Sequence, residues 1–103
     1  MYIYKAQLVR VVSGDTIRCW IDLGFGVSLN SMPVKLLNIK APTGIKGQKA
    51  LNYLLEILPM KFTLKTKLDG NLIVADIMYG GEKSISEQML ESGLVEKYQP
   101  NGN

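Results

Sequence analysis

The residues available for chemistry in this 103-residue chain are carboxylates, lysines and two arginines, because the sequence has no histidine and one cysteine, Cys19. Histidine is the usual general base near neutral pH and a common zinc ligand. A zinc site and a Ser-His or Cys-His nucleophile are therefore effectively excluded. Any hydrolysis would need carboxylates with a hard metal ion such as Ca²⁺ or Mg²⁺. The single cysteine cannot form an internal disulfide, which favours a reducing compartment.

The composition indicates an ordinary soluble globular domain. Apolar residues make up 47% of the chain and charged residues 20%, and the net charge is +3. That charge is compatible with a polyanionic partner without requiring one. No apolar run approaches the ~20 residues of a membrane span, and the first residues lack the layout of a signal peptide. We therefore expect a cytoplasmic protein with no membrane partner.

Five segments have the residue types and the alternation that are typical of β-strands. They are rich in β-branched and aromatic residues, or they alternate apolar with polar side chains. These segments are residues 2–12, 16–23, 32–39, 60–67 and 72–79. Within the second segment, Ile17, Cys19 and Ile21 occupy alternate positions and are expected to face the core. Asp69-Gly70 predicts a hairpin turn between the last two strands.

Two other segments predict helices. The first is indicated by leucines spaced as i, i+3, i+4 and i+7, namely Leu51, Leu54, Leu55 and Leu58. Pro59 is expected to end this helix, and a second helix is expected between a capping box that begins at Ser84 and a C-terminal Gly93. The resulting fold class is mainly β with two helices, in the order β-β-β-α-β-β-α of an OB-fold barrel. We expect one domain over residues 1–98 and a disordered tail over residues 99–103.

Three segments match motifs of a known family in order and spacing. Residues 11–17 are Val-Val-Ser-Gly-Asp-Thr-Ile, residues 34–42 are Val-Lys-Leu-Leu-Asn-Ile-Lys-Ala-Pro, and Ala-Asp-Ile at 75–77 precedes a segment at 84–94 that ends in Ser-Gly-Leu. They resemble the V-x-D-G-D-T, R-L-L-x-I-D-x-P-E and A-D-V … N-E-x-L-V-x-x-G-L-A segments of the staphylococcal nuclease-like (thermonuclease) family. The resemblance covers residues 5–98. It implies a five-stranded OB-fold barrel and Ca²⁺-dependent cleavage of phosphodiesters.

The same resemblance implies an active site in which most groups are replaced. Family members hold Ca²⁺ with two carboxylates, activate water with a glutamate and neutralise the phosphate with two arginines. Asp15 matches the first metal carboxylate and is retained. The other matched positions carry different residues: Lys35 for the first arginine, Lys40 for the second carboxylate, Thr43 for the glutamate, and Asn71 or Leu72 for the second arginine.

Each replacement removes a chemical function. Lys35 keeps a positive charge but lacks the planar fork of arginine, and Thr43 cannot act as a base near neutral pH. Lys40 reverses the charge of a metal ligand. We therefore hypothesise that the Lys40 ammonium takes the place of the calcium ion and pairs with Asp15. The plainer interpretations are that Asp15 bonds to nearby backbone N–H groups at a strand entrance and that Lys40 is a solvated lysine.

Several further residues are candidates for ligand contact. A basic rim around the cleft would use Arg18, Lys35, Lys40, Lys46 and Lys49, with Asp15 as a doubtful metal ligand. Trp20, Tyr53 and Tyr98 are aromatic residues that could stack on bases. The alternatives are solvated lysines and a tryptophan that covers one end of the barrel. The remaining aspartates that could replace a lost ligand are Asp22, Asp69 and Asp76.

These residues favour a degenerate nuclease-like barrel that binds either single-stranded nucleic acid or a protein partner through the ancestral cleft. One alternative is a weak metal-dependent nuclease that acts on DNA or RNA. Another is a regulatory or inhibitor module that acts by protein contact. We expect no cofactor, with Ca²⁺ only if a residual metal site persists, and either a monomer or a weak dimer.

Overall fold

The computed structural model describes residues 2–78 and 83–98, which form seven strands and two helices. The strands are β1 (Tyr2–Ser13), β2 (Thr16–Gly24), β3 (Val27–Leu36), β4 (Ile39–Lys40), β5 (Lys61–Asp69), β6 (Leu72–Met78) and β7 (Glu96–Lys97). The helices are α1 (Gly44–Ile57) and α2 (Ile85–Ser92). Within this part of the chain, no helix is long and apolar enough to cross a membrane. Tyr79 and the predicted tail at 99–103 lie outside the described residues.

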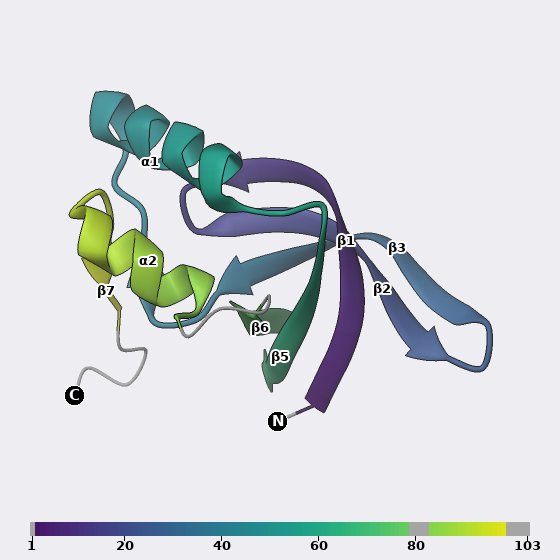
Figure 1. Cartoon of the computed structure of the whole chain (residues 1–103). Coiled ribbons are helices and arrows are strands. Elements are labelled where there is room, and N and C mark those ends of the chain that lie inside the picture. The colour runs from purple at the N-terminus through teal and green to yellow at the C-terminus, as the bar shows by residue number, and fades with distance from the viewer. Residues whose placement is uncertain (1, 79–82, 99–103) are drawn as a thin grey trace.

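Five of the strands close into a mixed barrel in the order β1-β2-β3-β6-β5 (Figure 1). Neighbouring strands are antiparallel except β3 and β6, which pair in parallel from Val34 opposite Ile73 to Leu36 opposite Ala75. β1 closes the barrel because its first half pairs with β5 and its later part with β2. This order, with α1 between the third and fourth barrel strands, is consistent with an OB-like barrel. The predicted mainly-β barrel is confirmed.

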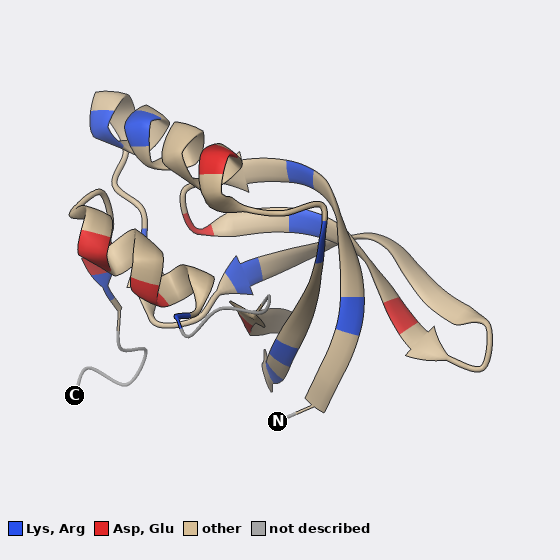
Figure 2. Cartoon of the chain, in the orientation of Figure 1, with Lys and Arg blue, Asp and Glu red and all other residues tan. Residues whose placement is uncertain are grey.

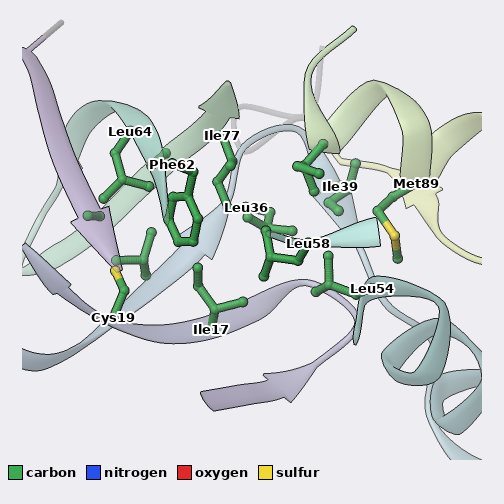
Figure 3. Packing of buried hydrophobic residues seen from close by; sticks show 14 of the residues in the cluster. Ile17, Cys19, Leu36, Ile39, Leu54, Leu58, Phe62, Leu64, Ile77 and Met89 are labelled. Atoms are coloured by element: carbon green, nitrogen blue, oxygen red, sulfur yellow. The ribbon is translucent and has the colours of Figure 1, made fainter. Parts of the chain in front are cut away.

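Alternate residues of the strands fill the barrel. Ile17, Cys19 and Ile21 of β2 are at most 2% exposed, which confirms the inward face predicted for this strand. Figure 3 shows buried side chains from the other strands and from both helices packed with them: Leu36, Phe62, Leu64, Ile77, Leu54 and Met89. The helices lie on one side of the barrel, and the β2–β3 hairpin extends from the opposite side (Figure 1).

The first helix differs from its predicted pattern. α1 runs from Gly44 to Ile57, so it begins earlier than the leucine stripe and ends before Pro59, as expected. Leu54 is fully buried, whereas Leu55 of the same stripe is 51% exposed. The buried face of the helix is therefore narrower than the predicted one, because only the residues that point at the barrel lose contact with water.

The third strand also differs from the prediction of residues 32–39. β3 starts at Val27 and ends at Leu36, and Asn38 then adopts a left-handed conformation with φ of 64°. Asparagine tolerates this region better than most residues, and the turn it makes breaks the strand. The chain continues as β4, which pairs with β7 near the C-terminus.

Both ends of α2 follow the predicted chemistry. The Ser84 hydroxyl oxygen accepts the backbone N–H of Glu87 at 3.2 Å, which satisfies one of the free donors at the helix start. Gly93 follows the last turn with a left-handed φ of 76°. This conformation carries no Cβ penalty for glycine, so the position suits the residue.

Candidate functional site

Asp15, the predicted metal ligand, bonds to the polypeptide through both carboxylate oxygens. Its Oδ1 accepts hydrogen bonds from the hydroxyls of Ser13 at 2.8 Å and Thr16 at 2.9 Å. Its Oδ2 accepts the backbone N–H of Ala41 at 2.9 Å, and its carbonyl oxygen accepts the N–H of Leu36 at 2.7 Å. Asp15 therefore ties the β1–β2 turn to the end of β3 and to the segment before α1, through two neighbouring hydroxyls and a distant N–H group rather than through the nearby backbone N–H groups that were expected.

Glycines allow these segments to approach closely. A Cβ atom on Gly14, in the β1–β2 turn, would lie 2.6 Å from the Cβ of Ala50 and 3.1 Å from that of Ala41. A Cβ atom on Gly47 would lie 2.3 Å from the carbonyl oxygen of Pro42. Real Cβ atoms do not approach neighbours this closely, so both positions require glycine for the turn, the 41–42 segment and α1 to pack as they do.

Lys40 does not pair with Asp15. It lies exposed on β4, where it is the register partner of Glu96 on β7. In the described residues the one ion pair is between Lys83 and Glu91, with Nζ 2.7 Å from the Glu91 carboxylate. The hypothesis of a built-in ammonium in the place of calcium is therefore wrong, because the donors of the chain itself occupy Asp15 and the Lys40 side chain lies in solvent.

Lys35 lies in a hollow on the outer surface of the barrel, together with a second lysine and a tyrosine. Lys35, Val74 and Lys67 are cross-strand neighbours on β3, β6 and β5. Their side chains therefore share the outer face, with the two lysines about 10 Å apart at two strand spacings. The Lys35 Nζ lies 4.7 Å from the centre of the Tyr98 ring, within the range of a cation–π contact. We call this site the lysine hollow; its walls include Lys35, Asn38, Lys67, Leu72, Val74 and Tyr98.

The lysine hollow is formed by residues that are far apart in the sequence. The N–H of Tyr98 donates to the carbonyl oxygen of Asn38 at 2.8 Å, just beyond the β4–β7 ladder, and this bond brings the C-terminal segment beside β3. Leu72, one of the two positions matched to the family's second arginine, also lines the hollow. Sequence reasoning missed Lys67. The alternation within residues 60–67 places this lysine on the outer face, but only the parallel pairing of β3 with β6 shows that it lies near Lys35.

Trp20 lies on the barrel's outer surface, at a different place from the lysine hollow. It lines an open groove of about 510 Å³ together with Lys5 of β1 and Lys61 of β5. Its ring is partly exposed, and its register partner on β1 is Gln7. The structure therefore separates Trp20 from Asp15 and Lys35. Tyr53, by contrast, packs against the core.

The remaining basic candidates are distributed between β2 and α1. The Arg18 guanidinium donates to the Ser31 hydroxyl at 2.9 Å and to the Ser31 carbonyl oxygen, so its planar fork is bound to β3. Lys46 and Lys49 lie exposed on α1, outside the walls of the lysine hollow. Thr16 pairs with Lys35 and Arg18 with Pro33, so Arg18 and Lys35 share the outer face of the barrel. Figure 2 shows the basic positions of α1 apart from those of the barrel strands, and a rim that includes all five residues stays a prediction.

Asp22 and Asp76, which could have replaced a lost ligand, are bonded locally. Asp22 Oδ1 accepts the N–H of Gly24 at 2.8 Å, and Asp76 Oδ1 accepts the N–H of Ile77 at 3.0 Å. The Asp69 side chain lies outside the described part. Over residues 2–78 and 83–98, no three His, Cys, Asp or Glu side chains come together as a metal site would require. A scan against protein-family models and a search of curated proteins found no match for this sequence.

Proposed function

We propose that this protein is a staphylococcal nuclease-like barrel that binds the phosphate backbone of single-stranded nucleic acid in the lysine hollow without cleaving it. The observation that carries the proposal is the arrangement of Lys35, Lys67 and the Tyr98 ring on one outer face. Ammonium groups attract phosphate oxygens, and an aromatic ring offers a surface on which a base can stack.

The size of the lysine hollow favours a phosphate group over a base. Its volume is about 80 Å³, and a water molecule occupies roughly 30 Å³ of liquid volume. A small anion such as a phosphate group matches this space. Bases would therefore lie outside the hollow, against Tyr98 and the 40% exposed side chain of Leu72.

The charges of the hollow are free to act on an anion. Within the described residues, the one lysine in an ion pair is Lys83, so no carboxylate contacts Lys35 or Lys67. The ring of Tyr98 holds the Lys35 side chain over the hollow but cannot neutralise its charge. An incoming phosphate therefore does not have to displace a competing carboxylate.

The chemistry around Asp15 supports binding without cleavage. The family's metal is Ca²⁺, but the Asp15 carboxylate already accepts three hydrogen bonds from the chain, out of about four acceptor positions. The matched second ligand is the exposed Lys40, so the residues present do not fit a Ca²⁺ site. The matched base, Thr43, lies exposed before α1 and cannot accept a proton from water at neutral pH.

A salt titration with fluorescently labelled single-stranded DNA and RNA tests the proposal. Each phosphate neutralised on a single strand contributes about −0.7 to the slope of log affinity against log salt. The variant Lys35→Met should therefore weaken binding and reduce the magnitude of that slope by about 0.7. The matched control is Lys46→Met, which removes an exposed lysine of α1 and should change both quantities little. Equal effects of the two substitutions, or no binding at low salt, would exclude the lysine hollow as the site.

A cleavage assay separates this proposal from the weak-nuclease alternative. The same oligonucleotides are incubated with Ca²⁺, Mg²⁺ or Mn²⁺, beside the variant Asp15→Ala. We expect no cleavage above background by either protein. Metal-dependent cleavage that disappears in Asp15→Ala would establish the nuclease instead. Binding that does not vary with salt, or that occurs only with a protein, would favour the protein-contact module.

A further inference from the structure

The tip of the β2–β3 hairpin exposes a phenylalanine completely. Phe25 is fully exposed, and Gly24, Phe25 and Gly26 all have left-handed backbone conformations, with φ of 85°, 55° and 75°. A bulky residue is rarely found in this region, where glycine or asparagine is favoured. Both the backbone conformation and the solvent exposure of Phe25 are therefore unfavourable for a phenylalanine. Such conflicts are expected at functional positions.

The barrel end remote from the helices holds an apolar cavity. Its volume is about 400 Å³, and all five barrel strands contribute to its wall. We call it the barrel mouth; it is lined inside by Tyr4, Leu29 and Ile73 and at its exposed rim by Tyr2, Leu23 and Leu68. A cavity of this size at the mouth of a barrel is large enough to accept an aromatic side chain.

The turn that carries Phe25 and most of β3 lack charged residues. Residues 23–34 contain no Asp, Glu, Lys or Arg. Asp22, which pairs with Ser28 close to the turn, is the charged residue nearest Phe25 on β2, whereas Lys67 lines the barrel mouth. A hairpin that docks on a mouth thus brings together two apolar surfaces bordered by opposite charges. The lack of basic residues on the hairpin disfavours an anionic membrane as its target.

We propose that two copies of the chain form a two-fold symmetric dimer in which Phe25 of each copy enters the barrel mouth of the other. The hairpin and the mouth lie on the same side of the molecule, because Leu23 and Leu29 of the hairpin strands line the mouth. A two-fold axis therefore forms both contacts at once, as in an isologous interface. The barrel mouth and the lysine hollow share one lining residue, Lys67, and the inference does not depend on phosphate binding in the hollow.

The exposed apolar surface is large enough for such a dimer. A stable interface buries about 800 Å² on each partner, and an aromatic side chain buries 150–250 Å². Phe25 and Tyr2, the latter 72% exposed, supply about half of this area. Further apolar area comes from Val27, which is 54% exposed, from Leu23, which is 38% exposed, and from Leu68, which is 76% exposed. Together with the hairpin backbone, these residues supply an area similar to that of the two aromatic side chains.

Analytical ultracentrifugation of the full chain over a range of concentrations tests the dimer. We expect a species of twice the 11.4 kDa chain mass. Phe25→Asn suits the left-handed backbone and should weaken dimerisation at least about 100-fold, because two central aromatic contacts are lost per dimer. The matched control Ile45→Asn removes an apolar side chain that is 81% exposed on α1, and it should leave dimerisation unchanged. A monomer at every concentration, or equal effects of both substitutions, would overturn the proposal.

Mixing two defective variants tests the reciprocal geometry. Leu68→Glu places a charge at the rim of the barrel mouth and leaves Phe25 intact, whereas Phe25→Asn leaves the mouth intact. An equimolar mixture should dimerise at least tenfold more tightly than either variant alone, because one native contact can form in the mixed pair. A mixture that associates no better than its components would contradict the proposal. Phe25-dependent binding to lipid vesicles without dimerisation would contradict it as well.

Discussion

The Asp15 carboxylate and the backbone N–H of Ala41, 26 residues apart in sequence, are joined by a hydrogen bond of 2.9 Å. The sequence motif predicted a metal ligand at this aspartate. Here it holds the β1–β2 turn against the chain segment that leads into α1. The bonding partners of this carboxylate therefore give it a structural role in this chain.

Replacement of Asp15 should destabilise the fold. Asp15→Ala leaves the partly buried Ala41 N–H and two hydroxyls without their acceptor, which should cost about 1–3 kcal/mol of unfolding free energy. Urea denaturation followed by circular dichroism measures this loss. Glu56→Ala, on the exposed surface of α1, is the control and should change stability by less than about 0.5 kcal/mol. A fully stable Asp15→Ala protein would show that the hydrogen bonds contribute little.

A methyl group at position 14 should also destabilise the protein. Gly14→Ala places Cβ 2.6 Å from the Cβ of Ala50, and relief of this clash requires the turn and α1 to separate. Overpacking of this kind costs about 1–3 kcal/mol. In a double-mutant cycle measured by urea denaturation, Ala50→Gly should recover part of that cost. If the two substitutions changed the unfolding free energy additively, the contact between positions 14 and 50 would not be the cause of the destabilisation.

Cys19 should make stability fall at alkaline pH. Burial raises the pKa of the Cys19 thiol from 9.0 to about 11, because the thiolate is poorly solvated in the barrel core. Between these values the unfolded chain loses the thiol proton while the folded chain keeps it. The unfolded state then binds fewer protons, so the unfolding free energy falls by about 2–3 kcal/mol as the pH rises from 9 to 11.

The contribution of Cys19 is isolated by comparison with Cys19→Val, which keeps an apolar side chain of similar size. The difference in unfolding free energy between the two proteins should vary with pH only above about 9. In the folded protein the thiol should also react slowly with a thiol reagent near pH 8, and it should react freely after denaturation. Rapid reaction of the native protein would contradict the burial of Cys19.

The Arg18–Ser31 contact should hold the irregular part of the β2–β3 hairpin. Ser31 has a left-handed φ of 49°, and the Arg18 guanidinium bonds both its hydroxyl and its carbonyl oxygen. Arg18→Lys keeps the charge but lacks the fork, so it should cost about 1–2 kcal/mol. Amide hydrogen exchange should become faster in residues 28–32 and remain unchanged in α2. Uniform acceleration throughout the chain would indicate global destabilisation instead.

Most of the barrel could be predicted from local pattern. The alternation of Ile17, Cys19 and Ile21 gave the inward face of β2, and the chemistry of Ser84 and Gly93 gave both ends of α2. Prediction failed where tertiary contacts outweigh local pattern. The two-residue strands β4 and β7 are too short to have a period, and they exist because each pairs with the other.

For the candidate site, too, some features could be predicted from the sequence and others depended on tertiary contacts. The residue types alone exclude histidine chemistry and show one carboxylate, Asp15, in the first motif, with Lys40 and Thr43 in the second. The three-dimensional contacts were needed to show that the chain's own donors bond to Asp15 and that Lys35 lies beside Tyr98. The physical reason is that residue types fix which chemistry is available, whereas hydrogen-bond partners and neighbouring charges depend on strand pairings between distant segments.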